Sequence, residues 1–498
     1  MLNQGIISIE NNGIAKFSIK SEHVALRAVL FASGTDHHDD PVRECERHML
    51  RGACESLEGQ VFILNDLAAK KASVFIIATP DCVTPVATIT DKTLIIKTFG
   101  YPVSVGHCDA EDSEALVRGW YRLFYRPTPL HAMSNTWGDR NGRARVNDAF
   151  VRREIDSAAE LGIDVVQIDD GWQKGIPEVF DEDGRRVFDG DFWELKSDIF
   201  PNGIKPLAEY AKERSVSLGL WFAPHSRGVY EYFDRDVEVL RKAYNRWGVR
   251  YFKLDMLMLP TVEYCYKTED FLDEVFSFGE EVSVELDVTA DKRLGFLASA
   301  PYGVIFVENR YTAWKNYYPH RTLRNLWLLS RFIPASKFQF EILNTELNRD
   351  KYDKNDPFRP ELYDADYLFA SVMFSNPLFW METQFLSSDS KQALKAIIEK
   401  WRKYSEVFAF ADITPIGDEP SGSAFTGFMA DLGDSVHLLL FREGAEQTEY
   451  TFRINAELRN AELIHSNAAV DFVASEGSVT AKFEKMRSYA WIKADKLG

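Results

Sequence analysis

The chain has 498 residues, of which 45% are hydrophobic and 27% charged, a composition typical of globular proteins with substantial cores. This length predicts two or three domains. The formal net charge of −18 argues against nucleic acid or an anionic membrane as partner, because like charges repel. No stretch approaches the roughly 18 apolar residues that span a bilayer. A small, neutral or cationic ligand is therefore expected.

The cysteines and the first residues of the chain indicate a cytosolic protein. The five cysteines show no paired spacing, so we expect reduced thiols and no disulfide framework. Residues 1–5 include no basic region followed by an apolar run, so no signal peptide is visible. A chain whose leader had been removed would look the same. We expect a cytoplasmic location, and the sequence leaves a homo-oligomer open.

Residues 1–125 alternate between apolar and polar side chains in the manner of β-strands, which predicts an N-terminal β domain. Segments 6–10 and 14–19 flank the sequence Asn-Asn-Gly at 11–13, whose turn chemistry predicts a β-hairpin. Further strands are expected at 61–64, 73–77 and 93–97.

Between residues 126 and 408 strands alternate with helices. Residues 149–161 predict an amphipathic helix, and further helices are expected at 204–214 and 234–247. No glycine-rich phosphate loop follows the first strand, so a closed (β/α)8 TIM barrel is favoured over an open sheet. The eight strands are expected to end at 134–137, 167–170, 220–223, 253–255, 285–287, 307–310, 338–342 and 372–375.

Residues 409–498 again have the pattern of strands. Strands are expected at 435–441, 448–453, 479–483 and 488–492. Together they predict a small antiparallel β-sandwich. The predicted fold is therefore a TIM barrel flanked by an N-terminal β domain and a C-terminal β-sandwich.

Four of the predicted barrel strands end in carboxylates. Asp255 ends the fourth strand two residues after Lys253, so the two side chains share one face. The other three strands end in Asp169-Asp170, in Glu285-Leu286-Asp287 and in Glu308-Asn309-Arg310. Because the carboxyl ends of barrel strands meet at one face, these residues predict a single acidic pocket.

The carboxylates of this pocket are oxygen ligands of the kind a hard cation accepts. However, Lys253 and Arg310 already supply positive charge, and no histidine lies among the strand ends. We therefore expect neither a metal ion nor a cofactor.

Glycoside hydrolysis suits the pocket better. In this chemistry one carboxylate attacks the anomeric carbon, and a second, protonated carboxyl group donates to the leaving oxygen. Asp255 suits the nucleophile because Lys253 keeps it ionised. Glu308 suits the acid if a dry environment or a like charge raises its pKa. Asp287 and Asp291 are the rivals of Glu308 for this role.

Other residues near the strand ends suit the binding of a sugar. Asp169 and Asp170 would accept hydrogen bonds from hydroxyl groups. Trp137, Trp172 and Trp221 would form apolar walls against the pyranose faces.

Three of these segments resemble the signatures of clan D glycoside hydrolases, most closely the α-galactosidase (melibiase) group of family 36, with family 27 next. They are Asp-Asp-Gly-Trp at 169–172, Leu-Gly-Leu-Trp at 218–221 and Tyr-Phe-Lys-Leu-Asp at 251–255. The resemblance covers roughly residues 130–345. It implies a (β/α)8 barrel flanked by β domains and a retaining double displacement. It also implies that Asp255 is the nucleophile, that Asp169 and Asp170 bind sugar hydroxyls, and that Lys253 and Trp221 line the site.

The sequence departs from the family pattern at two strand ends. The fifth strand of the family ends in Glu-Leu-Cys before a glycine-rich turn, whereas here Asp287 stands where a contact to the 2-substituent of the sugar is expected. The sixth carries a Ser-Asp-x-Thr-Asp motif with the acid/base, whereas here the sequence is Glu308-Asn309-Arg310-Tyr311. Glu308 takes the acid/base role by position, and Arg310 would orient its carboxylate.

The leading prediction is a retaining, exo-acting α-glycosidase whose substrate is a small carbohydrate, with α-galactosides favoured. Other specificities remain open, such as α-N-acetylgalactosaminidase, another α-glycosidase or a transglycosidase. A catalytically silent sugar-binding barrel is the alternative from a different class of protein.

Overall fold

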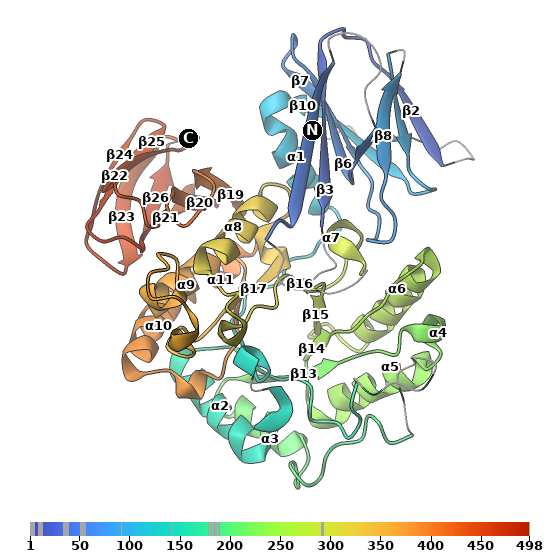
Figure 1. The fold of residues 1–498 in the computed structure, drawn as a ribbon, viewed down its shortest axis with the longest axis vertical. Coiled ribbons are helices and arrows are strands. Elements are labelled where there is room, and N and C mark those ends of the chain that lie inside the picture. Colours follow the sequence, from blue (N-terminus) through green and yellow to red (C-terminus); the bar gives the residue numbers. More distant parts are fainter. Residues whose placement is uncertain are drawn as a thin grey trace.

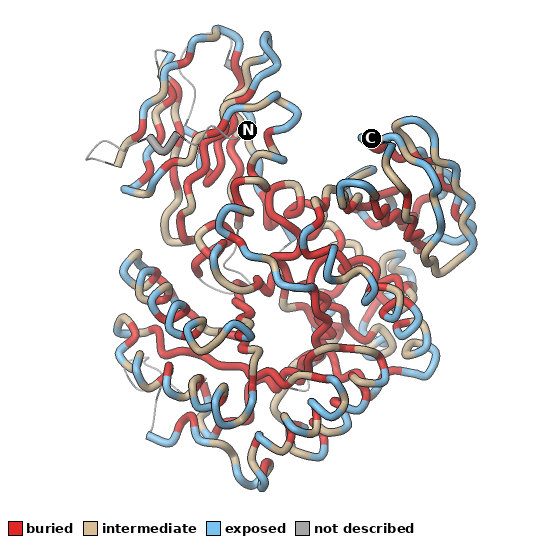
Figure 2. Tube along the Cα trace, turned by 180° about the vertical axis from the view of Figure 1, so that it is seen from behind, coloured by how far each residue is buried: buried red, intermediate tan, exposed pale blue. Residues whose placement is uncertain are grey.

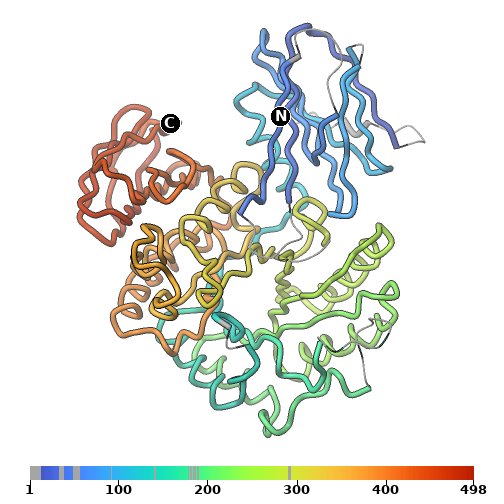
Figure 3. The backbone as a smooth tube through the Cα atoms, in the orientation of Figure 1, coloured from blue at the N-terminus to red at the C-terminus, as the bar shows by residue number. Residues whose placement is uncertain are grey.

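The computed structural model describes residues 5–7, 13–32, 39–49, 56–90, 92–140, 142–177, 179, 182, 187, 190–289 and 293–497. Figure 1 shows a central barrel with two β regions on one side of it. Helix α8 (Pro319–Ser330) lies between these two regions (Figures 1 and 3). Its Arg324 forms one ion pair with Asp40 of the N-terminal region and another with Glu419 of the C-terminal region.

Eight parallel strands close the barrel in chain order, which confirms the predicted TIM-barrel fold. The first and last strands close the ring through the pairs Met133–Leu378 and Ser134–Phe379. The strands are β11 (Met133–Asn135), β12 (Val165–Ile168), β13 (Ser217–Phe222), β14 (Tyr251–Leu254), β15 (Ser283–Asp287), β16 (Val304–Phe306), β17 (Phe338–Ile342) and β18 (Asn376–Phe379).

Helices surround the barrel and bury their apolar faces against the strands (Figure 2). Helix α2 (Asp148–Leu161) shows why they form where they do. The Asn147 side chain caps its first turn by accepting from the Phe150 amide at 3.0 Å, and Gly162 ends it with a positive φ of 81°. The others are α3 (Lys205–Lys212), α4 (Arg227–Tyr230), α5 (Phe233–Lys242), α6 (Val262–Phe276), α7 (Gly295–Ala298), α8, α9 (Ala365–Val372), α10 (Ser388–Trp401) and α11 (Ser405–Phe408).

The prediction for the eighth strand was wrong. Residues 372–375 form the end of α9 and the turn after it, and the strand begins at Asn376. Every residue of α9 from Asp366 to Val372 is buried, so its apolar run lacks the periodicity that separates a helix from a strand.

The N-terminal region consists of two facing antiparallel sheets with a core between them. The described residues show no hairpin between the predicted segments 6–10 and 14–19, because β1 pairs with β10 whereas β2 pairs with β9. Residues 8–12 of this prediction lie outside the described residues. The strands are β1 (Gly5–Ile7), β2 (Ile14–Ser18), β3 (Val24–Phe31), β4 (Val42–Met49), β5 (Leu57–Glu58), β6 (Val61–Asp66), β7 (Lys71–Ile76), β8 (Val86–Thr90), β9 (Thr93–Lys97) and β10 (Val103–Asp109), followed by α1 (Ser113–Tyr121).

The C-terminal region pairs a five-stranded sheet with a three-stranded one, both antiparallel, around a core that includes Leu438, Phe452, Val479 and Ile492. The predicted antiparallel sandwich is confirmed. The strands are β19 (Asp412–Gly417), β20 (Phe425–Asp431), β21 (Ser435–Arg442), β22 (Glu449–Arg453), β23 (Leu458–Ser466), β24 (Val470–Ser475), β25 (Ser478–Phe483) and β26 (Ser488–Lys496). The domain boundaries at 125 and 408 stay predictions.

Two further expectations concern the state of the cysteines and the presence of membrane-spanning segments. Cys45, Cys82, Cys108 and Cys265 carry thiols, and Cys54 lies outside the described residues. In the described part of the chain, every helix is too short or too polar to cross a bilayer.

Candidate active site

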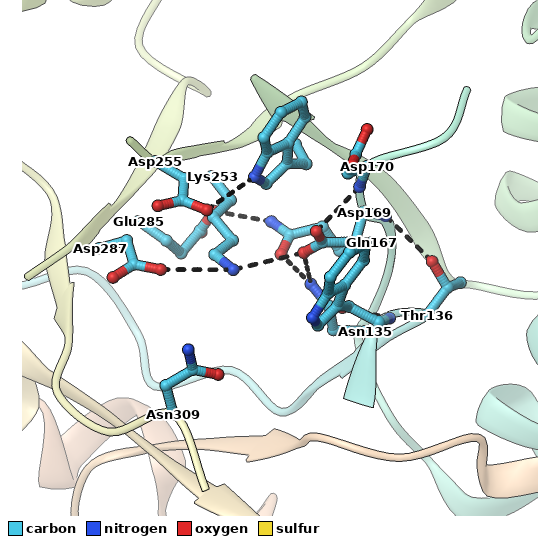
Figure 4. A network of polar contacts seen from close by, with 12 residues as sticks. Asn135, Thr136, Gln167, Asp169, Asp170, Lys253, Asp255, Glu285, Asp287 and Asn309 are labelled. Atoms are coloured by element: carbon cyan, nitrogen blue, oxygen red, sulfur yellow. Dashed lines mark hydrogen bonds and ion pairs between the residues drawn. The ribbon is translucent and has the colours of Figure 1, made fainter. Parts of the chain in front are cut away.

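Polar side chains from β11, β12, β14 and β15 meet inside the carboxyl-terminal mouth of the barrel (Figure 4). Asn135 at the end of β11 donates from Nδ2 to Gln167 Oε1 at 2.7 Å and to Asp169 Oδ2 at 2.8 Å. Gln167 on β12 in turn donates to Glu285 Oε2 on β15 at 3.0 Å. Burial raises the pKa of Glu285 to about 7. This chain of hydrogen bonds fixes the floor of the pocket.

Lys253 on β14 lies between two carboxylates. Its Nζ is 3.4 Å from Asp169 Oδ2 and 3.5 Å from Asp287 Oδ2. The ammonium also lies 4.7 Å from the centre of the Trp380 ring. Burial lowers the pKa of Lys253, but the nearby carboxylates raise it more, so the net shift is upward. Lys253 is therefore a fixed positive charge.

Asp255 follows β14 directly and is partly exposed, whereas Lys253 and Asp287 are buried. The indole nitrogen of Trp221 donates to Asp255 Oδ2 at 3.0 Å, and the Met256 amide donates to Oδ1. Burial raises the pKa of Asp255, but Lys253 and the Trp221 hydrogen bond lower it below its usual value. Asp255 is thus an ionised carboxylate at the open side of the pocket.

Asp287 at the end of β15 has the opposite tendency. Burial and the neighbouring charge of Asp255 raise its pKa to about 6, although Lys253 acts in the other direction. Its Oδ1 accepts from the Thr289 amide at 2.9 Å and from the Thr289 hydroxyl at 2.6 Å, whereas Oδ2 faces Lys253. Two adjacent carboxyl groups thus have different proton affinities.

The register of β14 and β15 sets the distance between these two residues. Lys253 pairs with Glu285 and Leu254 pairs with Leu286, so Asp255 and Asp287 occupy the next pair of opposite positions. Neighbouring strands are about 4.8 Å apart, and opposite residues point to the same face. The two carboxylates therefore extend side by side into the barrel mouth (Figure 4).

The neighbouring residues Asp169 and Asp170 face different partners. Asp169 faces Lys253 and Asn135, as described above. Asp170 forms an ion pair with Arg143 and accepts from Gln173 Nε2 at 2.6 Å. Strand β12 ends at Ile168, so both aspartates lie beyond its regular geometry, before Gly171 with its φ of +123°.

The three predicted tryptophans occupy different environments. Trp172 is buried, packs against the Trp193 ring, and donates from Nε1 to the main-chain oxygen of Trp221 at 2.9 Å. Its hydrogen bond therefore joins Trp172 to the backbone of Trp221, whose side chain binds Asp255. Trp137 is partly exposed and donates from Nε1 to the Tyr311 hydroxyl at 3.1 Å.

Glu308 and Arg310 form a separate, sealed cluster. Glu308 has no exposed surface, and its two oxygens accept from Thr322 Oγ1 at 2.7 Å and from Asn325 Nδ2 at 2.5 Å, both on α8. Arg310 Nε lies 3.2 Å from Glu308 Oε2, and Arg310 Nη2 donates to Asp39 Oδ1 at 2.9 Å. Both oxygens of Glu308 are thus satisfied within this cluster. Asp291 lies outside the described residues.

Sequence reasoning missed several residues of the pocket. Gln167 lies two residues before Asp169, so the period of a strand predicts that both face inward. Asn309 is uncharged and lies in the sequence between Glu308 and Arg310, so it was not predicted. Its side chain lies on the side of the pocket near Asp287 (Figure 4). Asn135 carries no charge, and no sequence pattern marks it as a residue of the site. No group of three or more potential metal ligands occurs among the residues that the structure describes.

Comparisons with known proteins agree with this geometry. A family model described as Glycoside hydrolase 97 matches residues 129–279, a segment that includes β11 to β14 and Asp255. Alpha-galactosidase AgaA of Geobacillus stearothermophilus is 35% identical over 109 residues, which are 22% of this chain and 13% of that protein. Alpha-galactosidase 2 of Pediococcus pentosaceus is 29% identical over 127 residues, which are 23% of this chain and 16% of that protein. The matched segments thus span less than a fifth of these relatives' lengths.

Solved structures extend the likeness to nearly the whole chain. The GH36 α-galactosidase AgaA from Geobacillus stearothermophilus superposes with a TM-score of 0.71 at 15% identity, and covers 97% of this chain and 76% of that one. The resemblance predicted from the motifs is confirmed: segments of the chain are similar to a glycoside hydrolase family model and to α-galactosidases, and its fold is that of the GH36 structures.

Proposed function

We propose that this chain is a retaining, exo-acting α-glycosidase that removes terminal α-galactosyl groups. The observation that carries the proposal is the pair Asp255 and Asp287, which extend side by side from neighbouring strands. Retaining glycosidases hold their two carboxyl groups about 5–5.5 Å apart, close to the spacing of adjacent strands of about 4.8 Å. Inverting enzymes need a wider gap to admit a water molecule.

The two ionisation states suit the two roles of a double displacement. Asp255, with its lowered pKa, attacks the anomeric carbon and forms a covalent glycosyl ester. Asp287, whose pKa is about 6, gives its proton to the departing glycosidic oxygen. In the second step the Asp287 carboxylate takes a proton from water, the water oxygen bonds to the anomeric carbon, and the bond to Asp255 breaks. The sugar leaves with its original configuration.

The contacts favour Asp287 over Glu308 as the acid. Glu308 already receives hydrogen bonds from Thr322, Asn325 and Arg310 and has no exposed surface. Asp287 keeps one oxygen directed to Lys253 and the pocket. Its raised pKa also favours proton donation over the contact with the 2-substituent that its position predicts.

The preference for galactosides rests on the relatives. The proteins with matching segments are α-galactosidases, and solved relatives of the same fold were crystallised with raffinose and with stachyose. Asp169, held between Asn135 and Lys253, and Asp170 after it supply carboxylate acceptors for the hydroxyl groups of such a sugar.

A panel of nitrophenyl α-glycosides tests the proposal. We expect hydrolysis to be fastest with the α-galactoside, and the first product seen by ¹H NMR to be the α-anomer. Faster hydrolysis of the α-N-acetylgalactosaminide would reassign the sugar, and transfer to an added alcohol would indicate a transglycosidase. If the protein binds a galactoside but hydrolyses no glycoside of the panel, it is a catalytically silent sugar-binding barrel. Asp255→Asn serves as the inactive control.

A further inference from the structure

The segment that follows Asp287 is fastened to the N-terminal region. Asp81, which lies between β7 and β8, donates its main-chain N–H to the carbonyl oxygen of Arg293 at 3.1 Å. The Arg293 amide donates back to Asp81 Oδ2 at 3.1 Å. Because the two bonds run in opposite directions between the same residues, a shift of either segment breaks both.

Helix α7 is shaped to accept this contact. Gly295, its first residue, has a φ of +72°, and a Cβ atom there would lie 2.4 Å from Asp81 Oδ1. Only glycine combines this backbone conformation with the space for the carboxylate. The Tyr121 hydroxyl of α1 adds a second anchor by donating to the Phe296 carbonyl oxygen at 2.8 Å.

The side chain of Arg293 reaches from this attachment to the end of β15. Its Nε donates to the main-chain oxygen of Asp287 at 3.1 Å. The residue is only 3% exposed, and its Nη1 is buried and has no hydrogen-bond partner in the described ranges. The guanidinium carries a full positive charge, which lowers the pKa of both Asp255 and Asp287.

Lys253 and the other titratable groups that interact with it lie beside the Asp255–Asp287 pair, and their charges influence how the pair changes with pH. They are Lys253 on β14, Asp169 after β12, Glu285 on β15, Tyr311 after β16 and Glu341 on β17. Among them only Lys253 is cationic, so Arg293 is the second positive charge that acts on the pair within the described part of the site.

We propose that Asp81 and Arg293 form a clamp by which the N-terminal region fixes the exit of β15 and holds a positive charge beside Asp255 and Asp287. Arg293 acts through the two carboxylates, and Asp81 acts through Arg293, so both are positioning residues. The inference rests on the proposed function, because it assigns the N-terminal region a part in setting the pH range of that reaction.

The first test is the dependence of kcat/KM on pH with nitrophenyl α-galactoside. Arg293→Gln removes the charge, so the pKa values of Asp255 and Asp287 both rise, and the whole profile moves to higher pH by about one unit. Arg293→Lys keeps the charge and should restore most of the original profile. Asp81→Ala should move the profile in the same direction by a smaller amount. The matched control Asp109→Asn removes an exposed carboxylate of the same region and should leave the profile unchanged.

Hydrogen–deuterium exchange provides a readout that does not require activity. In Asp81→Ala the amides of residues 293–299 should exchange faster than in the wild type, whereas Asp109→Asn should show no change. If the wild type hydrolyses no glycoside, the proposed function fails and the exchange result alone decides on the clamp. Unchanged exchange in Asp81→Ala overturns the clamp, and so does an unmoved pH profile in a folded Arg293→Gln. If Arg293→Gln does not fold, Asp81→Ala decides both measurements.

Discussion

The barrel contains two pairs of carboxylates at equivalent places on neighbouring strands. Asp255 and Asp287 follow the register of β14 and β15, and Glu308 and Glu341 follow that of β16 and β17, where Phe306 pairs with Gln339. In each pair one carboxylate lies within 3.5 Å of a buried cation, which is Lys253 in the first case and Arg310 in the second. The first pair has one partly exposed member, Asp255, whereas Glu308 and Glu341 are both fully buried.

The difference between the pairs lies in what surrounds them. The Glu308 pair is closed by Thr322 and Asn325 of α8, and the Arg310 amide donates to Glu341 Oε1 at 2.6 Å. Burial raises the pKa of Glu341 well above its usual value. Both oxygens of Glu308 accept hydrogen bonds from α8, whereas the partners of Asp255 and Asp287 come from the strand ends themselves.

The largest expected effect comes from removing the charge of Asp255, the partly exposed carboxylate of the first pair. Asp255→Asn should lower kcat on the order of 10⁴-fold or more, because no covalent intermediate can form. With an activated aryl galactoside, added azide should partly restore turnover and give a β-galactosyl azide. Circular dichroism should show an unchanged fold. Turnover close to that of the wild type would remove Asp255 from the mechanism.

The next largest effect is expected for Asp287 and tests whether the two carboxylates of the first pair have different roles. Asp287→Asn should slow substrates with poor leaving groups by about 10²–10⁴-fold, because they need a proton at the glycosidic oxygen. Nitrophenyl and dinitrophenyl galactosides should keep a nearly normal first step, which a burst of nitrophenolate in stopped-flow absorbance measures. Equal losses for both classes of substrate would instead identify Asp287 as a binding residue.

Substitution in the Glu308–Glu341 pair should lower the stability of the protein and leave its catalytic rate almost unchanged. Glu308→Gln removes one of the two carboxylates that pair with the buried Arg310 guanidinium, so the free energy of unfolding should fall by about 3 kcal/mol in urea titrations. The kcat of the folded variant should stay within a few-fold of the wild type. The matched control is Glu419→Gln, whose exposed ion pair with Arg324 should contribute at most about 1 kcal/mol. A leaving-group dependence in Glu308→Gln would return the acid role to Glu308.

The smallest effect is a change with pH in the unaltered protein. Asp287 must be protonated to act as the acid, so kcat/KM should fall as pH rises through about 6, by up to tenfold per pH unit. Asp255 must be ionised, and its lowered pKa places the acid limb below the usual range of an aspartate. In Asp287→Asn the alkaline limb should disappear. A profile that is flat between pH 5 and 8 would contradict this assignment.

The sequence predicted the barrel and the Lys253–Asp255 strand because both depend on local patterns. The two-residue spacing of Lys253 and Asp255 places them on one face whatever surrounds them. The surroundings of Glu308 depend on α8, whose Thr322 and Asn325 lie 14 and 17 residues further along the chain, and no period in the sequence reports that contact. The clamp joins residues 212 positions apart, and it too could be found only in the structure.

The closure of the barrel has a consequence for how the protein folds. Strand β11 supplies Asn135 to the floor of the pocket, yet its second neighbour, β18, is made about 240 residues later, and the two share only the pairs Met133–Leu378 and Ser134–Phe379. Contacts of such long range form slowly, because the intervening chain loses conformational entropy before the contact contributes any stabilisation. On the ribosome β12 to β17 emerge before the ring can close. The ring of the barrel should therefore be completed late and in one step, when β18 inserts between β17 and β11.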